Sequence, residues 1–126
     1  MMYHLFLLCC GASVGVVLRD LTARIVGQAF GSEFPLGTLI VNVLGSVLIG
    51  FFFVICSSKE AYDSFWRPLL FIGALGGFTT FSTFSLELLL MMERGEWALS
   101  VGYAFISLIS CFAGVYFGAQ FARGLA

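Results

Sequence analysis

The chain contains four long apolar stretches, separated by short stretches that are rich in polar and charged residues. A helix that crosses a membrane needs about 20 mostly apolar residues, so each stretch is long enough for one span. We predict an all-α membrane protein, a single four-helix transmembrane domain (residues 1–126), with spans at about 3–26, 35–56, 68–92 and 97–121.

The first span must extend beyond its apolar part. Leu5–Leu18 covers 14 residues, about 21 Å at helical rise, which is shorter than a hydrocarbon core of roughly 30 Å. The helix should therefore continue to about Val26, which places Arg19 near the membrane interface. Asp20 and Arg24 are spaced to pair, and Arg19 has no partner in its own helix. Arg19 either faces a water-filled cavity or reaches the lipid headgroups.

The third apolar stretch contains a segment, Gly73–Ser85, that is unlike an uninterrupted helix. It holds three glycines, which weaken a helix, and several serines and threonines, whose hydroxyls can bond to freed backbone groups. We predict that the third helix is broken near its middle. A bilayer tolerates such a break where it is buried in protein or lines a wet cavity. The alternative is a close helix contact of small residues.

Composition supports a membrane protein and argues against other classes. Hydrophobic residues make up 60% of the chain and charged residues 10%, whereas a soluble domain is about 25% charged. The low charged fraction makes the lipid bilayer the expected surrounding, and the net charge of −1 argues against nucleic acid as a partner. No nucleophile has a base at motif spacing, so we do not expect an enzyme. The cysteines form no CxxC pair and are expected to be free thiols: Cys9, Cys10, Cys56 and Cys111.

Basic residues are divided equally between the two sides of the expected bundle. The side with both termini carries Lys59, Arg67 and Arg123, and the other side carries Arg19, Arg24 and Arg94. The positive-inside rule therefore gives no preferred orientation. A chain that inserts both ways can pair with an antiparallel second copy, whereas a minor bias would fix one orientation.

Polar side chains within the spans are mostly hydrogen-bond donors. Asn42 lies two turns into the second span, and Thr38 lies on the same face. In the fourth span, Tyr103, Ser107 and Cys111 recur at i, i+4 and i+8. These donors favour transport of an anion, because a cation path would need inward carboxylates. The alternative is that they bond within or between helices.

Two phenylalanines in Gly73–Ser85 are also spaced for one helix face. Phe81 and Phe84 could turn their electropositive ring edges to a small anion and steady it without binding it tightly. The alternative is ordinary core packing. Glu87 is the one remaining carboxylate that a cation path could use.

Three segments resemble the Fluc (CrcB) family of fluoride channels. Gly37–Gly45 is similar to that family's second-helix signature, and Gly73–Ser85 followed by Glu87 is similar to its third-helix signature. Gly11–Gly15 leading to Arg19 resembles the first-helix pattern. The resemblance covers all four spans, and the run Gly-Gly-Phe-Thr-Thr-Phe-Ser-Thr-Phe-Ser is highly specific.

The resemblance implies an antiparallel, dual-topology homodimer with two fluoride pores in a bacterial plasma (inner) membrane. Its role would be passive export of fluoride from the cytoplasm, and so fluoride resistance. Asn42, Phe81 and Phe84 would line each pore. Further pore or fluoride-binding residues would be Thr38, Ser82, Thr83, Tyr103 and Ser107.

The resemblance also implies sites outside the pore. Arg19 would attract anions at a vestibule. A structural sodium ion is expected on the dimer axis, held by backbone oxygens of Gly76 and Thr79 from both copies. Cys111 departs from the family pattern, which has a hydroxyl at that position.

Two other functions are consistent with four short spans. A small multidrug-type exporter, which exchanges protons for cationic drugs, would need a carboxylate in its first span. Here that span has none before Asp20, which lies beside an arginine. A scaffold subunit that only packs would not explain a donor-rich stripe beside a glycine-rich segment.

Overall fold

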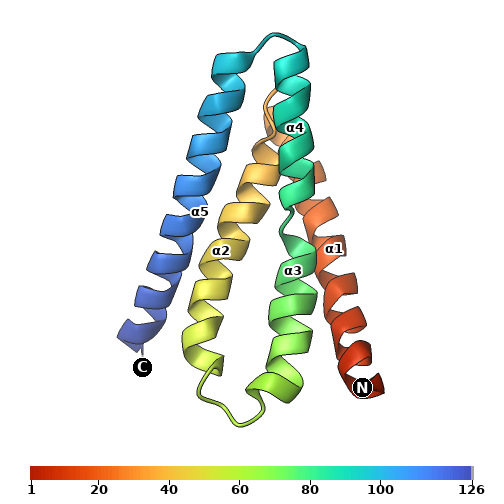
Figure 1. The fold of residues 1–126 in the computed structure, drawn as a ribbon, viewed down its shortest axis with the longest axis vertical. Helices are drawn as coiled ribbons and strands as arrows, with labels where there is room; N and C mark the ends of the chain where they lie inside the picture. The colour runs from red at the N-terminus through yellow and green to blue at the C-terminus, as the bar shows by residue number, and fades with distance from the viewer. Residues whose placement is uncertain (126) are drawn as a thin grey trace.

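The computed structural model describes residues 1–125 and consists of long helices that lie side by side (Figure 1). Four segments are long and apolar enough to cross a membrane, and within residues 1–125 no residue lies in a strand. The predicted all-α fold with four spans is therefore confirmed. The elements are α1 (Met2–Phe30), α2 (Leu36–Cys56), η1 (Tyr62–Leu75), α3 (Gly76–Phe78), α4 (Phe81–Glu93) and α5 (Trp97–Leu125).

The segments run alternately in opposite directions. Both termini and the loop between α2 and η1 lie at one end of the molecule, and the connection from α4 to α5 lies at the other (Figure 1). α1 continues beyond the expected span end near residue 26 and stops at Phe30. It stops there because Gly31 adopts a φ of 84°, which glycine reaches without steric cost. Gly95, with a φ of 78°, turns the chain from α4 into α5 in the same way.

The third segment starts at Tyr62, earlier than the expected start near Pro68. Its first part, η1, has wider turns than an α-helix, since the amide of Trp66 donates to the carbonyl of Ala61 over 3.2 Å. Pro68 is buried inside η1. Proline has no amide hydrogen and its ring clashes with a regular helical turn. The wide turns of η1 thus accommodate Pro68, which was expected to begin the third span.

Glycines allow the segments to pack closely. A Cβ atom at Gly11 or Gly15 of α1 would collide with a backbone carbonyl of the third segment. A Cβ atom at Gly50 of α2 or Gly118 of α5 would collide with a carbonyl of the facing helix. Small residues at such positions let helix backbones approach each other. The glycines therefore join α1 to the third segment and α2 to α5.

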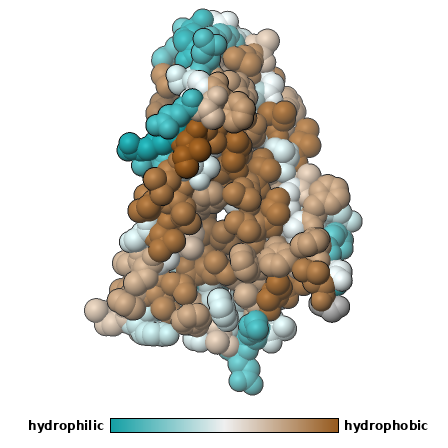
Figure 2. Space-filling view, turned by 180° about the vertical axis from the view of Figure 1, so that it is seen from behind, coloured by the Kyte–Doolittle hydropathy of each residue, from teal (hydrophilic) through white to brown (hydrophobic). Residues whose placement is uncertain are grey.

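The outside of the molecule is apolar around its middle. In Figure 2, hydrophobic residues cover the central part of the face shown, and hydrophilic residues gather mainly toward the two ends. Phe105, Phe112 and Phe121 of α5 are among the exposed rings. The buried core is small and includes Phe84 and Tyr103. An apolar band with polar ends is the surface that a lipid bilayer requires.

Candidate functional site

The backbone between α3 and α4 is extended at two residues. Thr79 has φ −83° and ψ 157°, and Thr80 has φ −150° and ψ 116°. The Asn42 side chain, from α2, bonds to both backbone groups of Thr80. Its Nδ2 donates to the Thr80 carbonyl over 3.0 Å, and its Oδ1 accepts from the Thr80 amide over 2.7 Å. Asn42 therefore satisfies backbone groups that a continuous helix would pair internally.

Thr80 also caps the helix that follows. Its Oγ1 accepts from the amide of Thr83 over 3.3 Å and donates to the Thr83 hydroxyl over 3.0 Å. Threonine at this position satisfies one of the amides that have no partner at a helix start. Thr80 was not singled out from the sequence, although threonine is one of the residues preferred at a helix N-cap.

Two backbone carbonyls beside the extended residues accept no hydrogen bond from a helical amide within residues 1–125. The amides of Thr80 and Thr83 are bonded to side chains, so within residues 1–125 they do not reach the carbonyls of Gly76 and Thr79. The Thr79 carbonyl instead accepts a hydrogen bond from Nη1 of Arg19 over 3.3 Å. Gly76 and Thr79, which were expected to bind a sodium ion through their backbone, thus have carbonyl oxygens that accept no helical hydrogen bond within residues 1–125.

A cavity of about 310 Å³, here called the central cavity, lies beside the extended segment. Asn42 and Ser107 contribute polar groups to its wall, and Phe81 and Phe84 contribute rings. The Oγ of Ser107 is fully buried and makes no hydrogen bond of normal geometry within residues 1–125, although the hydroxyl of Tyr103, one helical turn earlier, lies close enough to interact with it. Asn42 also keeps one amide hydrogen beyond its bond to Thr80.

The two phenylalanines differ in exposure. Their ring centroids lie 5.5 Å apart, with the ring planes at 52°. Phe84 is 5% exposed and packs against Tyr103 at a centroid distance of 5.2 Å, whereas Phe81 is 72% exposed. In a single chain, the wall of the central cavity is therefore incomplete beside Phe81.

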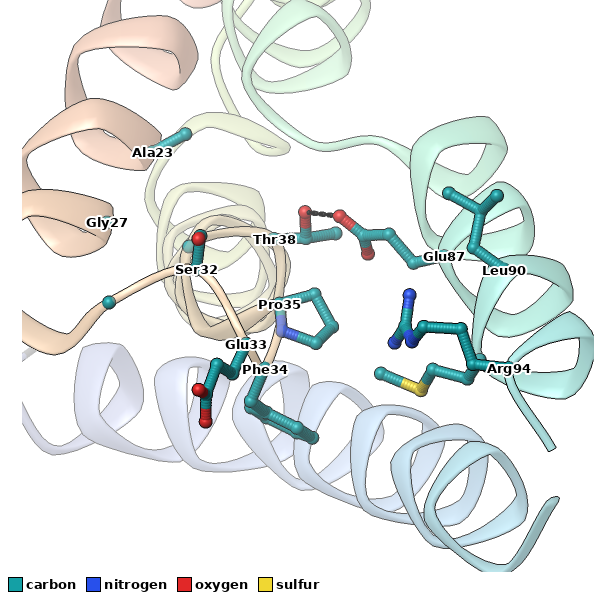
Figure 3. A pocket seen from close by; sticks show the side chains of 13 residues that line it. Ala23, Gly27, Ser32, Glu33, Phe34, Pro35, Thr38, Glu87, Leu90 and Arg94 are labelled. Carbon is teal, nitrogen blue, oxygen red and sulfur yellow. Dashed lines mark hydrogen bonds between the residues drawn. The ribbon is translucent and has the colours of Figure 1, made fainter. Parts of the chain in front are cut away.

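A carboxylate brings together two of the hydroxyls expected in the pore. Thr38 Oγ1 donates to Glu87 Oε1 over 2.6 Å (Figure 3), and the Tyr103 hydroxyl donates to Glu87 Oε2 over 2.8 Å. Tyr103 is almost completely buried. Glu87 was not expected to take part in an anion path. Its position three residues after Phe84, on the same helical face, was the signal that could have placed it there.

A second cavity, here called the loop-side cavity, has a volume of about 290 Å³ and extends from Thr38 and Glu87 toward the loop after α1 (Figure 3). Arg94 and Glu33 also line it. Arg94 binds Glu96 through Nε and Nη2, over 3.2 and 3.1 Å. These hydrogen bonds raise the pKa of Arg94 and lower the pKa of Glu96, because each group stabilises the charged form of the other.

The expected site residues fall into two main groups. The central cavity is lined by Asn42, Gly76, Thr79, Phe81, Phe84 and Ser107. A third cavity, of about 480 Å³ beside α1, is lined by Arg19, Thr38 and Thr83. Ser82 is exposed and lines neither of these cavities.

Comparison with known proteins gives consistent matches along the chain. A family model described as "CrcB-like protein, Camphor Resistance (CrcB)" matches residues 6–119. A protein of Chelativorans sp. (strain BNC1) named "Fluoride-specific ion channel FluC" is 40% identical over 124 residues, which are 98% of this chain and 99% of the relative. Proteins with the same name from Shewanella oneidensis and Shewanella baltica are 42% identical over 119 residues, 94% of this chain and 95% of each relative. This chain, an all-helical protein with four membrane-length segments, belongs to the CrcB family.

Proposed function

We propose that this chain forms a fluoride-selective channel through which fluoride leaves the bacterial cytoplasm passively, giving fluoride resistance. The observation that carries the proposal is the central cavity, whose wall combines the polar residues Asn42 and Ser107 with Phe81 and Phe84. The relatives from Chelativorans and Shewanella are named as fluoride-specific channels, and these names suggest which anion enters it. A bacterial inner membrane is the corresponding location.

The central cavity suits an ion that must lose its water. Fluoride is small and strongly hydrated, so a narrow pore must replace its water with other donors. Asn42 and Ser107 offer neutral donors, and the edges of Phe81 and Phe84 offer weakly electropositive surface. Neutral groups can hold the ion weakly enough to release it, which a fixed positive charge would hinder.

The hydroxyls of Thr38 and Tyr103 extend the proposed path toward the loop-side cavity. Both donate to Glu87 in the structure, so a passing fluoride ion would compete with that carboxylate for them. Each hydroxyl has one hydrogen and can turn to a new acceptor without moving its helix. This supports a stepwise transfer of the ion between donors.

Three further residues belong to the proposal at the edges of the path. Ser82 and Thr83 add hydroxyls beside Phe81 on α4, and both are exposed in the single chain. Arg19 is half-buried in the third cavity, where its positive charge would raise the local concentration of anions. We assign it to a vestibule.

The proposed channel is an antiparallel, dual-topology homodimer with two pores. The central cavity is incomplete beside Phe81, which is 72% exposed, so a second copy would complete its wall. The basic residues are divided equally between the two sides of the bundle, so the chain can insert into the membrane in either orientation.

The proposal includes a break of the third span in the membrane and a structural sodium ion on the dimer axis. Gly76 and Thr79 fit such an ion, because their carbonyls receive no helical amide within residues 1–125 and unwound backbone oxygens can coordinate sodium. The Thr79 oxygen accepts a bond from Arg19 and keeps a second lone pair. A bound sodium ion would hold the two copies together through these oxygens.

A proton-coupled exporter of cationic drugs is not supported. Such a protein needs a carboxylate inside its first span, and Asp20 is exposed and bonded to Arg24 over 2.7 Å. The relatives with high identity are named as fluoride channels.

The test is fluoride efflux from liposomes that contain the purified protein. With valinomycin carrying potassium to balance the charge, we expect fluoride to leave the liposomes and chloride to stay inside. Empty liposomes are the control. A fluoride efflux no faster than that of empty liposomes would end the channel proposal.

A further inference from the structure

The extended residues Thr79 and Thr80 connect α3 to α4, and these two helices pack against different neighbours (Figure 1). α3 and η1 pack against α1, where a Cβ atom at Gly15 would collide with the carbonyl of Ala74. α4 packs mainly against α5. Within residues 1–125, the backbones of α1 and α4 do not come close to each other. The direct link between α1 and α4 is therefore the extended pair and the side chains that hold it.

Two side chains hold the extended pair, one from α2 and one from α1. Asn42 of α2 bonds to the amide and the carbonyl of Thr80. Arg19 of α1 is half-buried, and its Nη1 donates to the carbonyl of Thr79 over 3.3 Å. Within residues 1–125, no other side chain of α1 hydrogen-bonds to another segment. Arg19 thus fastens α1 to the backbone that leads into α4.

The extended pair sets where the wall of the central cavity begins. Thr80 caps α4, which starts at Phe81, and Phe84 follows one turn later. Both rings line the central cavity, whereas Arg19 lies outside it, in the third cavity. A displaced Thr79 carbonyl would displace the cap and the first turn of α4 with it. Any effect of Arg19 on the shape of the central cavity must therefore pass through the backbone of Thr79.

We propose that Arg19 is a positioning residue for anion selectivity: by holding the Thr79 carbonyl, it fixes the first turn of α4 and so the width of the central cavity beside Phe81. This inference rests on the proposed channel function and adds a second role to the attraction of anions by the Arg19 charge. The two roles have different consequences. A positive charge attracts fluoride and chloride alike and is screened by salt, so it leaves the ratio of their rates unchanged. A cavity wall that is free to move would also admit the larger chloride ion.

The first measurement is the ratio of fluoride to chloride efflux from liposomes that contain the full-length protein. R19M removes the charge and the donor but keeps a long side chain. We expect this variant to lower the ratio roughly tenfold, because a hydrogen bond from a charged donor shifts a local equilibrium by at least about that factor. R19K keeps the charge and one donor, so its ratio should lie closer to that of the wild type. The ratio does not depend on the fraction of protein that folds, so a loss of stability alone would not change it.

R24M is the matched control. It removes a charge from the same helix and the same side of the bundle, but Arg24 is exposed and bonds to Asp20. The R24M variant should keep the wild-type ratio.

The second measurement is hydrogen exchange at the amides of Thr80 and Thr83, which are bonded to side chains in the structure. In lipid nanodiscs, we expect exchange at these amides to be roughly tenfold faster in R19M than in the wild type, and unchanged in R24M. If R19M does not fold, R19Q takes its place, because its neutral side chain is too short to span the same distance.

Three results would overturn the proposal. An R19M channel with the wild-type ratio, and a fluoride efflux that falls only at low salt, would show that Arg19 acts by its charge alone. Unchanged exchange at Thr80 and Thr83 would show that Arg19 does not hold the extended pair. An R19K protein no more selective than R19M would contradict the role of the donor. Absence of fluoride efflux in the wild type would contradict the channel instead, and the exchange measurement would still decide whether Arg19 holds this backbone.

Discussion

Asn42 has two functions in the proposed channel, and they are linked by its side-chain amide. Its oxygen and one amide hydrogen hold the extended backbone at Thr80, while the second amide hydrogen remains for the central cavity. A side chain with only one polar atom could not do both. This explains why an asparagine, rather than a serine or threonine, suits an apolar stretch of α2.

Replacing Asn42 should therefore affect stability and transport together. In Asn42→Ala, the amide and carbonyl of Thr80 lose their partners, which costs about 1–3 kcal/mol for each buried group left unpaired. We expect a lower melting temperature in detergent and fluoride efflux at the level of empty liposomes.

Thr22→Ala is the control for this change. Thr22 is half-buried, and its side chain bonds only to the Leu18 carbonyl of its own helix, so the variant should keep both stability and efflux. An Asn42→Ala protein with wild-type efflux would exclude Asn42 from the path.

Ser107→Ala should separate transport from stability. The Ser107 hydroxyl makes no hydrogen bond of normal geometry within residues 1–125, so its removal costs at most a weak contact with the Tyr103 hydroxyl. We therefore expect little change in the melting temperature. Fluoride efflux should fall, since the central cavity loses a donor. Unchanged efflux together with unchanged stability would mean that the hydroxyl contacts no ion.

Some of the site was accessible from sequence because it depends on local spacing. Thr38 and Asn42, or Ser107 and Cys111, are each four residues apart, and a helix places such pairs on one face. The partner of Asn42 is Thr80, and the partner of Tyr103 is Glu87, from a different segment of the chain in each case. One sequence does not specify which helix faces lie opposite each other, so these pairs could not be predicted.

At the scale of the elements, apolar runs predict the spans well but not how each helix begins and ends. The third segment begins at Tyr62 because the wide turns of η1 continue through Pro68, a geometry that no spacing rule indicates. α1 ends at a glycine with positive φ, and glycine occurs too often in this chain to mark an end on its own.

Packing of α5 against α2 can be tested with two glycines of the same helix. A Cβ atom at Gly118 would collide with a carbonyl of α2, whereas a Cβ atom at Gly102 meets no atom within 4 Å. We expect Gly118→Ala to lower the melting temperature in detergent. Gly102→Ala should be neutral or raise it, because alanine is a better helix former by about 1 kcal/mol. Equal effects of both substitutions would show that the contact does not hold α5 in place.

At the scale of the whole molecule, one chain leaves its best candidate site incomplete. The central cavity lacks a wall beside Phe81, and the core that holds the single chain together is small. The exposed apolar rings of α5 would be covered by lipid or by a second copy. An antiparallel second copy is compatible with the charges, because neither side of the bundle holds an excess of basic residues.

Changing the number of basic residues on one side of the bundle should abolish fluoride transport, and co-expression of two opposite variants should restore it. R24Q/R94Q leaves more basic residues on the side of the termini, and K59Q/R67Q leaves more on the opposite side. The bonds lost are exposed surface pairs, worth about 0–1 kcal/mol each, so both variants should fold. If the active unit is antiparallel, each variant alone inserts in one orientation and passes little fluoride, whereas co-expression of both supplies the two orientations and restores efflux. A reporter fused to the C-terminus gives the orientation independently. A variant that is uniformly oriented and still passes fluoride like the wild type would show that the channel does not need an antiparallel partner.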